Sequence, residues 1–324
     1  MIGLPDYVFR LRQQNDAVDC SNKHGLIVGG TRGLGAAAAE RLAGLGASIT
    51  IVGRTAEAGR LVLENCRARS PNSTAAMFNM ITGDLSLLAE VDRIASDVAD
   101  LCQTRKVGID FVVFTAGCYG SSAGWTMLSS TTRTSEDIDY WFSLLYLSRH
   151  LLIQRILPLL ELSTAACVVN VFRAGSRASL DLNNLGLSGK GNLETISSIG
   201  LYIDAMTISL AQMHNSIEFY HLGAGPMVPY PVVENTTQLP ALAWLARTLQ
   251  PWLYAQSPLA SEAAEAVVSL TVEPHRAVSR SGALMSYRLE CVPPTQFIQS
   301  PDTLERIWQY TKSLLSHRGF NGLR

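Results

Sequence analysis

The sequence predicts an α/β fold: a doubly wound parallel sheet of about seven strands with helices on both faces, in a single domain. Three observations support this prediction. Strand-like and helix-like segments alternate from residue 24 to about residue 222, the strand-like segments are apolar throughout, and a glycine-rich turn follows the first of them. Continuously apolar strands are typical of a parallel sheet that helices cover on both faces.

Six segments have the length and the apolar, often β-branched composition of buried strands, and a seventh strand is expected after a long carboxy-terminal stretch. The periodicity of apolar residues between the strands predicts helices. The expected strands are 25–29, 48–52, 75–81, 110–114, 166–171, 217–221 and 283–290, and the expected helices are 36–45, 55–68, 86–103, 135–161, 192–214 and 302–315.

No linker divides the chain. We expect residues 1–21 to form an N-terminal arm and residues 22–324 to form one nucleotide-binding domain, with helical elements at 237–275 on the substrate side. A chain of 324 residues that is 47% hydrophobic is long enough to bury one large core.

Composition and charge argue against several classes of function. The formal net charge is −1, so no general attraction to nucleic acid or to an anionic membrane surface is expected. No uncharged run reaches the length of a membrane span, and the first ten residues lack the apolar region of a signal peptide. The six cysteines form no C-x-x-C pair, which favours a cytoplasmic protein with reduced thiols and no metal site.

A nucleotide-binding turn is the clearest motif. Residues 24–35 read His-Gly-Leu-Ile-Val-Gly-Gly-Thr-Arg-Gly-Leu-Gly, and they follow the first strand and open the first helix. Gly29, Gly33 and Gly35 allow a tight turn, and they let backbone N–H groups approach a pyrophosphate at the helix N-terminus.

The end of the second strand indicates which dinucleotide binds. An acidic residue there would accept a hydrogen bond from the ribose 2′-OH of NAD, but this chain has Arg54 instead. A guanidinium suits the 2′-phosphate of NADP, and Arg32 in the glycine turn would supply a second one. The predicted cofactor is therefore NADP(H), although either arginine can also be an ordinary surface residue.

These motifs resemble the short-chain dehydrogenase/reductase superfamily. Residues 28–35 are similar to its glycine turn, Asp84 lies in a Gly-Asp-Leu-Ser element like the one that contacts adenine, and Ala116-Gly117 ends a strand as Asn-Asn-Ala-Gly does in the family. The arrangement of residues 146–149 and 219–225 further resembles a divergent fungal branch linked to secondary metabolism. The resemblance implies a Rossmann-type fold and these cofactor-binding residues: Gly29, Thr31, Arg32, Gly33, Leu34, Gly35, Arg54, Asp84, Leu85, Ala116 and Gly117.

The usual catalytic residues of that superfamily are missing. No lysine follows a tyrosine by four residues anywhere in the chain. Counted back from Pro158, the family's asparagine position falls at or near Leu145, and its serine position falls at Arg173 within the segment 171–175. Counted back from Leu210-Ala211, its tyrosine and lysine positions fall near Ile196 and Gly200. Loss of a positioned general acid typically lowers a rate by about 10²–10⁴-fold.

Three residues are candidates to replace the missing groups. Arg173 would donate to an oxyanion or to a substrate carboxylate, Asp204 would act as a base, and Tyr202 would supply a phenol. A surface arginine, a solvated carboxylate and a packing aromatic are the respective alternatives. His221 is interpreted mainly as a buried supporting histidine.

Three functions remain open. The first is an NADP(H)-dependent oxidoreductase acting on an apolar small molecule. The second is a redox-neutral isomerase or cyclase, and the third is a non-catalytic NADP(H)-binding partner protein. The substrate is expected to contact the loops 118–134, 175–195 and 226–240, and the family resemblance implies a homodimer or homotetramer through the helices 135–161 and 192–214.

Overall fold

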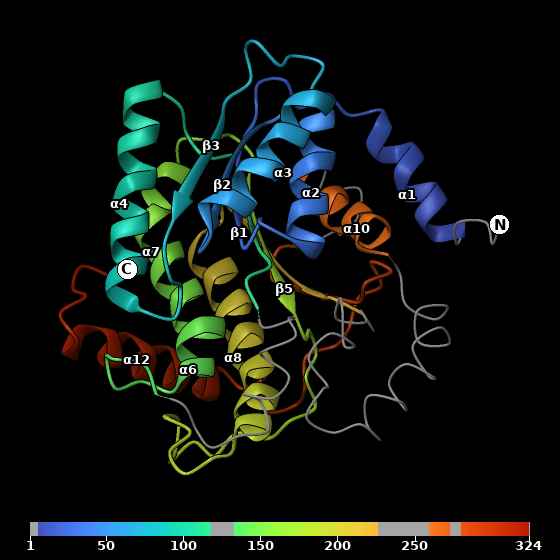
Figure 1. The fold of residues 1–324 in the computed structure, drawn as a ribbon. Helices are drawn as coiled ribbons and strands as arrows, with labels where there is room; N and C mark the ends of the chain where they lie inside the picture. Colours follow the sequence, from blue (N-terminus) through green and yellow to red (C-terminus); the bar gives the residue numbers. More distant parts are fainter. Residues whose placement is uncertain (1–5, 118–132, 226–258, 273–279, 324) are drawn as a thin grey trace, which may run out of the picture.

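The structure is a computed structural model that describes residues 6–117, 133–225, 259–272 and 280–323. Seven parallel strands form one sheet in the order β3-β2-β1-β4-β5-β6-β7, with helices on both faces (Figure 1). The predicted fold class is confirmed. The strands are β1 (His24–Val28), β2 (Ser48–Gly53), β3 (Phe78–Thr82), β4 (Phe111–Phe114), β5 (Ala166–Phe172), β6 (Ile217–Gly223) and β7 (Ala283–Met285).

The strand order reverses at β1. Val28, the last residue of β1, lies beside Val52 of β2 on one side and beside Phe114 of β4 on the other. The connections that leave β1 and β4 run to opposite faces of the sheet, which opens a crevice at their carboxyl ends. The glycine turn lies at this crevice.

The first helical layer covers one face of the sheet with an apolar core that includes Phe114, Leu151, Ile199 and Trp308. The predicted helix 135–161 begins at residue 140, where the Asp139 carboxylate accepts hydrogen bonds from two backbone N–H groups, and it contains a π-helical turn. This layer contains α4 (Leu88–Arg105), α6 (Tyr140–Phe142), the π-turn η1 (Ser143–Leu147), α7 (Ser148–Leu160), α8 (Asn192–Met213) and α12 (Pro301–His317).

The second layer covers the opposite face. It contains α2 (Gly33–Gly44), α3 (Ala56–Arg69) and α10 (Ala260–Val272), and α1 (Asp6–Asp16) lies against α10 (Figure 1). Within the expected range 237–275 only residues 259–272 are described, and α10 in that range packs against α2 and β5.

The expected N-terminal arm contains a docked helix. Glu265 of α10 is 1% exposed, and it accepts hydrogen bonds from Arg12 and Asn15 of this helix and from Arg41 of α2. A buried carboxylate needs such partners, because removing a charge from water without them is costly. Three segments distant in sequence are therefore held together at one point.

The seventh strand is shorter than predicted. β7 ends at Met285, and a turn with Leu289 at φ 61° returns the chain so that Cys291 pairs antiparallel with Met285. The predicted seventh strand is present, but its predicted end at residue 290 was wrong because the second half of that range is this turn and return. Val292 N donates to Leu284 O at 2.8 Å, so the returning segment covers the free edge of β7.

Candidate functional site

The nucleotide half of the site, residues 28–54 with 115–117, depends on close backbone contacts. Gly29 has φ +92°, and a Cβ there would lie 2.4 Å from Ala116 N. A Cβ on Gly35 would lie 2.4 Å from Thr115 Oγ1 and 2.6 Å from Gly29 O. Glycine is therefore required at both positions, since any side chain would push β1, β4 and α2 apart.

The same turn leaves an open cradle at the start of α2. Gly33 has φ +57°, and nothing lies within 4 Å of the position its Cβ would take. The N-cap residue Arg32 is extended, and its side chain makes no capping hydrogen bond. The first N–H groups of the helix therefore lack a side-chain acceptor, and their partial positive charge suits the pyrophosphate of a dinucleotide.

Two arginines border this cradle. A Cβ on Gly53 would lie 2.4 Å from Thr31 Cγ2, so the end of β2 touches the glycine turn. Arg32 and Arg54 each follow one side of this contact, both side chains are exposed, and neither forms a hydrogen bond or ion pair with the described residues. Such uncommitted guanidinium groups fit a phosphate on the adenosine ribose.

The remaining predicted cofactor residues lie at the neighbouring strand ends. The Asp84 carboxylate accepts hydrogen bonds from Ser86 N at 2.9 Å and from Ser86 Oγ at 2.8 Å, which fixes the loop before α4. The Leu85 side chain is buried in the core, so only its backbone can face a nucleotide. Ala116 and Gly117 follow β4, and Ala116 N donates to Val28 O.

In the reaction half of the site, residues 145–204 with His221, the backbone is closely packed around Gly200. At Gly200, the inferred lysine position, a Cβ would lie 2.8 Å from Ser176 Cβ and 2.9 Å from Arg173 O. Ser176 Oγ also donates to Ser197 O at 3.0 Å. The loop after β5 therefore occupies the space in which a side chain at Gly200 would begin.

A buried histidine–aspartate pair lies under that loop. His221 Nδ1 of β6 is 2.6 Å from Asp204 Oδ1 of α8, and both side chains are fully buried. Gly175 N donates to the same Asp204 oxygen at 3.3 Å. Asp204 therefore binds the loop and the sheet, and it does not face the crevice as a solvated base would.

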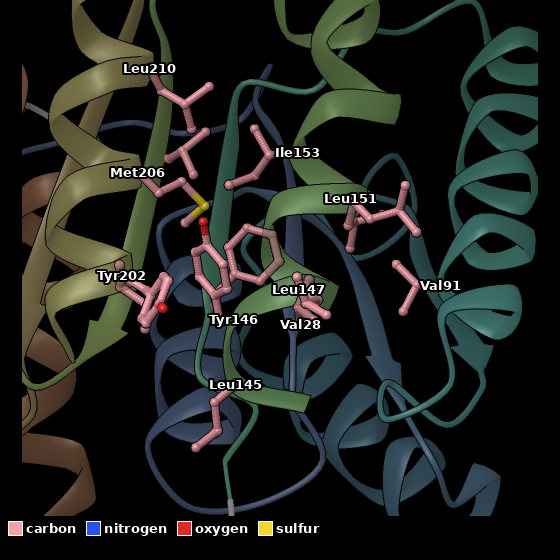
Figure 2. Packing of buried hydrophobic residues seen from close by; sticks show 14 of the residues in the cluster. Val28, Val91, Leu145, Tyr146, Leu147, Leu151, Ile153, Tyr202, Met206 and Leu210 are labelled. Carbon is pink, nitrogen blue, oxygen red and sulfur yellow. The ribbon is translucent and has the colours of Figure 1, made fainter. Parts of the chain in front are cut away.

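Neither of the other two catalytic candidates joins this pair. Arg173 is exposed, and its side chain forms no hydrogen bond with the described residues. Tyr202 OH donates to Leu185 O at 2.5 Å, and its ring contacts Tyr146 and Phe142. Figure 2 shows Tyr202 facing Tyr146 inside an apolar cluster, and burial raises the pKa of Tyr202, so the phenol keeps its proton. The structure therefore does not support Tyr202 as a proton donor at the crevice.

Sequence reasoning missed the role of Arg149. Its side chain is 1% exposed, and Nη2 donates to Ala116 O and Val171 O, both at 3.1 Å. The guanidinium also lies over the Phe114 ring, 5.8 Å from its centroid. A lone arginine within the apolar stretch 144–153 was the available signal, because a buried guanidinium in such a helix must find acceptors. Arg149 joins the carboxyl ends of β4 and β5.

Further groups in this half are buried and neutral. Burial lowers the pKa of His150 to about 3, and the His150 ring lies 4.7 Å from that of Trp308. Burial also disfavours the charged form of Tyr146 and so raises its pKa, and the Tyr146 hydroxyl is 2.8 Å from Thr311 Oγ1. The predicted loop 226–240 and residues 118–132 lie outside the described residues.

Two further features bear on function. In the described part of the chain, no group of histidine, cysteine and acidic side chains has the arrangement of a metal site. No helix among the described segments has both the length and the apolar character needed to cross a membrane.

Comparison with known proteins agrees with the geometry of the nucleotide half. The short chain dehydrogenase family model matches residues 23–182. Oxidoreductase AN1596 of Emericella nidulans is 31% identical over 62% of this chain and 57% of its own length, so the chain spans less than two thirds of that relative. Oxidoreductase andH of Emericella variicolor is 28% identical over 73% of this chain and 68% of its own length.

Solved structures share the fold at low sequence identity. An uncharacterized protein from Mycobacterium paratuberculosis is 16% identical, with a TM-score of 0.64 over 92% of this chain and 95% of its own. A short chain dehydrogenase of Shigella flexneri complexed with NADP is 17% identical, with a TM-score of 0.58 over 85% of this chain and 99% of its own. The NADH-dependent reductase A1-R′ complexed with NAD is 18% identical, with a TM-score of 0.55 over 84% of this chain and 96% of its own.

The glycine turn at the sheet's switch point, the seven-stranded parallel sheet and these matches lead to one conclusion. Over residues 23–182 the chain matches the short-chain dehydrogenase/reductase family, and its seven-stranded sheet is a Rossmann-type nucleotide-binding fold.

Proposed function

We propose that this protein is an NADP(H)-dependent oxidoreductase that acts on an apolar small molecule in secondary metabolism, in the cytoplasm, and that it transfers protons through groups other than a tyrosine–lysine pair. The nucleotide half carries this proposal, because its close glycine contacts are kept and two exposed arginines adjoin the cradle. The fungal relatives are named oxidoreductases, and the four described buried cysteines are free thiols, which agrees with a reducing compartment.

The residues present fit a dinucleotide. The first N–H groups of α2 would hold the pyrophosphate, Arg32 and Arg54 would hold a 2′-phosphate, and Ala116 and Gly117 would border the nicotinamide ribose. When bound, the nicotinamide supplies or accepts a hydride. Arg149 would fix the ends of β4 and β5 beneath it by its hydrogen bonds to Ala116 O and Val171 O.

Proton transfer needs a different solution in this chain. Arg173, at the inferred serine position, is free to donate to a developing oxyanion. A substrate that is already electron-poor, such as an iminium or an enone, needs less help from a general acid. The proposed substrate class is therefore an activated, largely apolar small molecule.

A nucleotide titration tests the cofactor assignment. NADPH and NADH are titrated against wild type, Arg54→Ala and the control Arg60→Ala, whose guanidinium is exposed but already paired with Glu57 and Glu64. We expect Arg54→Ala to weaken NADPH binding by roughly 10-fold or more and to leave NADH binding unchanged, since one charge-assisted contact is lost. Arg60→Ala should change neither affinity.

Equal loss of both nucleotides in Arg54→Ala would contradict the assignment of the 2′-phosphate site. Failure of wild type to bind either nucleotide would reduce the glycine turn to a remnant of the fold. NADPH consumption with a set of apolar ketones, enones and iminium compounds then tests the reaction itself.

A redox-neutral isomerase or cyclase is the second candidate. The observation that favours it is the closure at Gly200, where the loop after β5 leaves no room for the family's lysine. Substrate conversion that requires bound NADPH but leaves its absorbance at 340 nm unchanged would establish this alternative.

A further inference from the structure

The carboxy-terminal helix α12 covers the outer side of the first helical layer. Its buried residues form one stripe, which packs against α8 within the same apolar core and reaches η1 through Thr311 and Tyr146. The opposite side of α12 carries Glu305, Arg306 and Gln309, which are exposed. The buried stripe consists of Thr303, Leu304, Ile307, Trp308, Thr311 and Leu315.

Specific contacts hold α12 in this position. Thr311 Oγ1 is 2.8 Å from Tyr146 OH, and the Trp308 ring centroid is 4.7 Å from that of His150. Beyond the helix, Asn321 O accepts a hydrogen bond from Arg155 Nη1 at 2.8 Å. The helix is thus joined to the π-turn and to α7 by polar and aromatic contacts as well as by apolar packing.

The same helix and the residue that follows it, Arg318, support two loops at the substrate side. Arg306 Nη2 donates to Leu182 O at 3.2 Å, and Arg318 donates to the carbonyls of Glu136 and Asp137. A cavity of about 260 Å³ lies between these loops and α12, and Tyr310, Leu314 and Arg318 form its outer wall. One helix therefore closes the outer face and fixes the loops 133–139 and 182–190.

We propose that α12 takes the place of a second subunit, so that the working form of this protein is the monomer. The expected assembly face comprises residues 135–161 and 192–214, and α12 already packs against both segments. A partner on this face would have to displace α12 and expose its buried apolar stripe. The free edge of β7 is likewise covered, by the chain's own residues 291–292. This proposal does not depend on the cofactor or on the reaction.

The mass of the full chain in solution tests the proposal directly. Sedimentation equilibrium over roughly 1–100 μM should give the monomer mass of 35.1 kDa at every concentration, with and without NADPH. A species of twice that mass in this range would overturn the proposal. This measurement uses the unmodified protein, so it decides the question even if a variant fails to fold.

A matched pair of variants then tests whether α12 is the covering element. Trp308→Glu places a charge in the buried stripe, and Gln309→Glu places the same charge on the exposed side of the same helix. We expect Trp308→Glu to lower the melting temperature by on the order of 10 °C and to self-associate, because the outer face becomes exposed. Gln309→Glu loses only an exposed hydrogen bond to Glu305, so it should remain monomeric and lower the melting temperature by no more than about 2 °C. If Trp308→Glu behaves like Gln309→Glu, α12 does not cover an adhesive face and the proposal fails.

Discussion

The nucleotide half and the reaction half of the crevice differ in what makes them work. The nucleotide half depends on positions without a side chain, since Gly29 and Gly35 allow neighbouring segments of the chain to approach closely. In the reaction half the features are buried polar side chains, among them Arg149, Asp204 and His221. A site made from backbone constrains the residues at its close contacts tightly, whereas a site made from side chains can be rebuilt around a different chemistry.

The nucleotide half can be disrupted most severely at Gly29. Gly29→Ala should lower the free energy of unfolding by about 3 kcal/mol or more, because the new Cβ would meet Ala116 N at 2.4 Å and φ is +92°. Urea unfolding gives this value. Gly33→Ala is the control: its φ is also positive but its surroundings are open, so a loss of about 1–2 kcal/mol is expected. Equal losses in the two variants would show that the close approach is unimportant.

The reaction half should be the more sensitive to acid, because it holds His150 buried. Its pKa in the folded protein is about 3, against 6.5 as the ordinary value, so between these pH values the unfolded chain binds the extra proton. Stability therefore falls as the pH falls below 6.5, and His150 alone should cost about 2 kcal/mol at pH 5 relative to neutral pH.

Urea unfolding at pH 7 and pH 5 measures this effect. His150→Leu should show a pH dependence smaller by that amount, while His317→Leu, at an exposed site on α12, should behave like wild type. A wild-type stability that does not change between the two pH values would contradict the burial of a neutral His150.

A smaller effect is expected at Gly200, where the reaction half, like the nucleotide half, has a close contact that leaves no room for a Cβ. Gly200→Ala should destabilise by about 1–2 kcal/mol despite the better helix propensity of alanine, because its Cβ would press on Arg173 O and Ser176. Gly44 also lies in a helix, but the nearest atoms to its added Cβ would be those of Arg69 at 3.9 Å, so Gly44→Ala should leave stability unchanged or raise it. Chemical unfolding distinguishes these outcomes, and a stabilised Gly200→Ala would mean that the lysine position is open after all.

The smallest effect is expected at Arg173. Arg173→Ala should change the free energy of unfolding by less than about 0.5 kcal/mol and leave NADPH affinity unaltered, since its exposed side chain forms no hydrogen bond with the described residues. Thermal unfolding and the nucleotide titration measure both quantities. A loss above about 1 kcal/mol would contradict the exposed, unbonded position of Arg173.

The sequence predicted the features that depend on local pattern. Alternating apolar segments predicted the parallel sheet, and the glycine spacing predicted the turn at its switch point, because both follow from neighbouring residues. The predicted end of the seventh strand was wrong, because Leu289 takes a left-handed conformation that is uncommon for leucine and that the sequence therefore does not predict.

The reaction half could not be predicted in the same way. Spacing placed Asp204 correctly on α8, but its partner His221 comes from a strand that follows α8, and only the packed structure brings them to 2.6 Å. Tyr202 was chosen for its phenol, and its commitment to Leu185 O depends on a loop whose course has no sequence signature. The burial of Arg149 likewise depends on carbonyls at the ends of two strands.

The docking of α1 on α10 has a consequence for how the protein is made. Asn15 and Glu265 are 250 positions apart, so the first helix emerges from the ribosome long before its binding site exists. At ordinary translation rates this interval is roughly 10–50 s, during which Val8 and the future partners of Glu265 remain exposed to water. The first helix and α10 therefore come together late in folding, and a chain cut before α10 would leave its first helix without the partner that Glu265 provides.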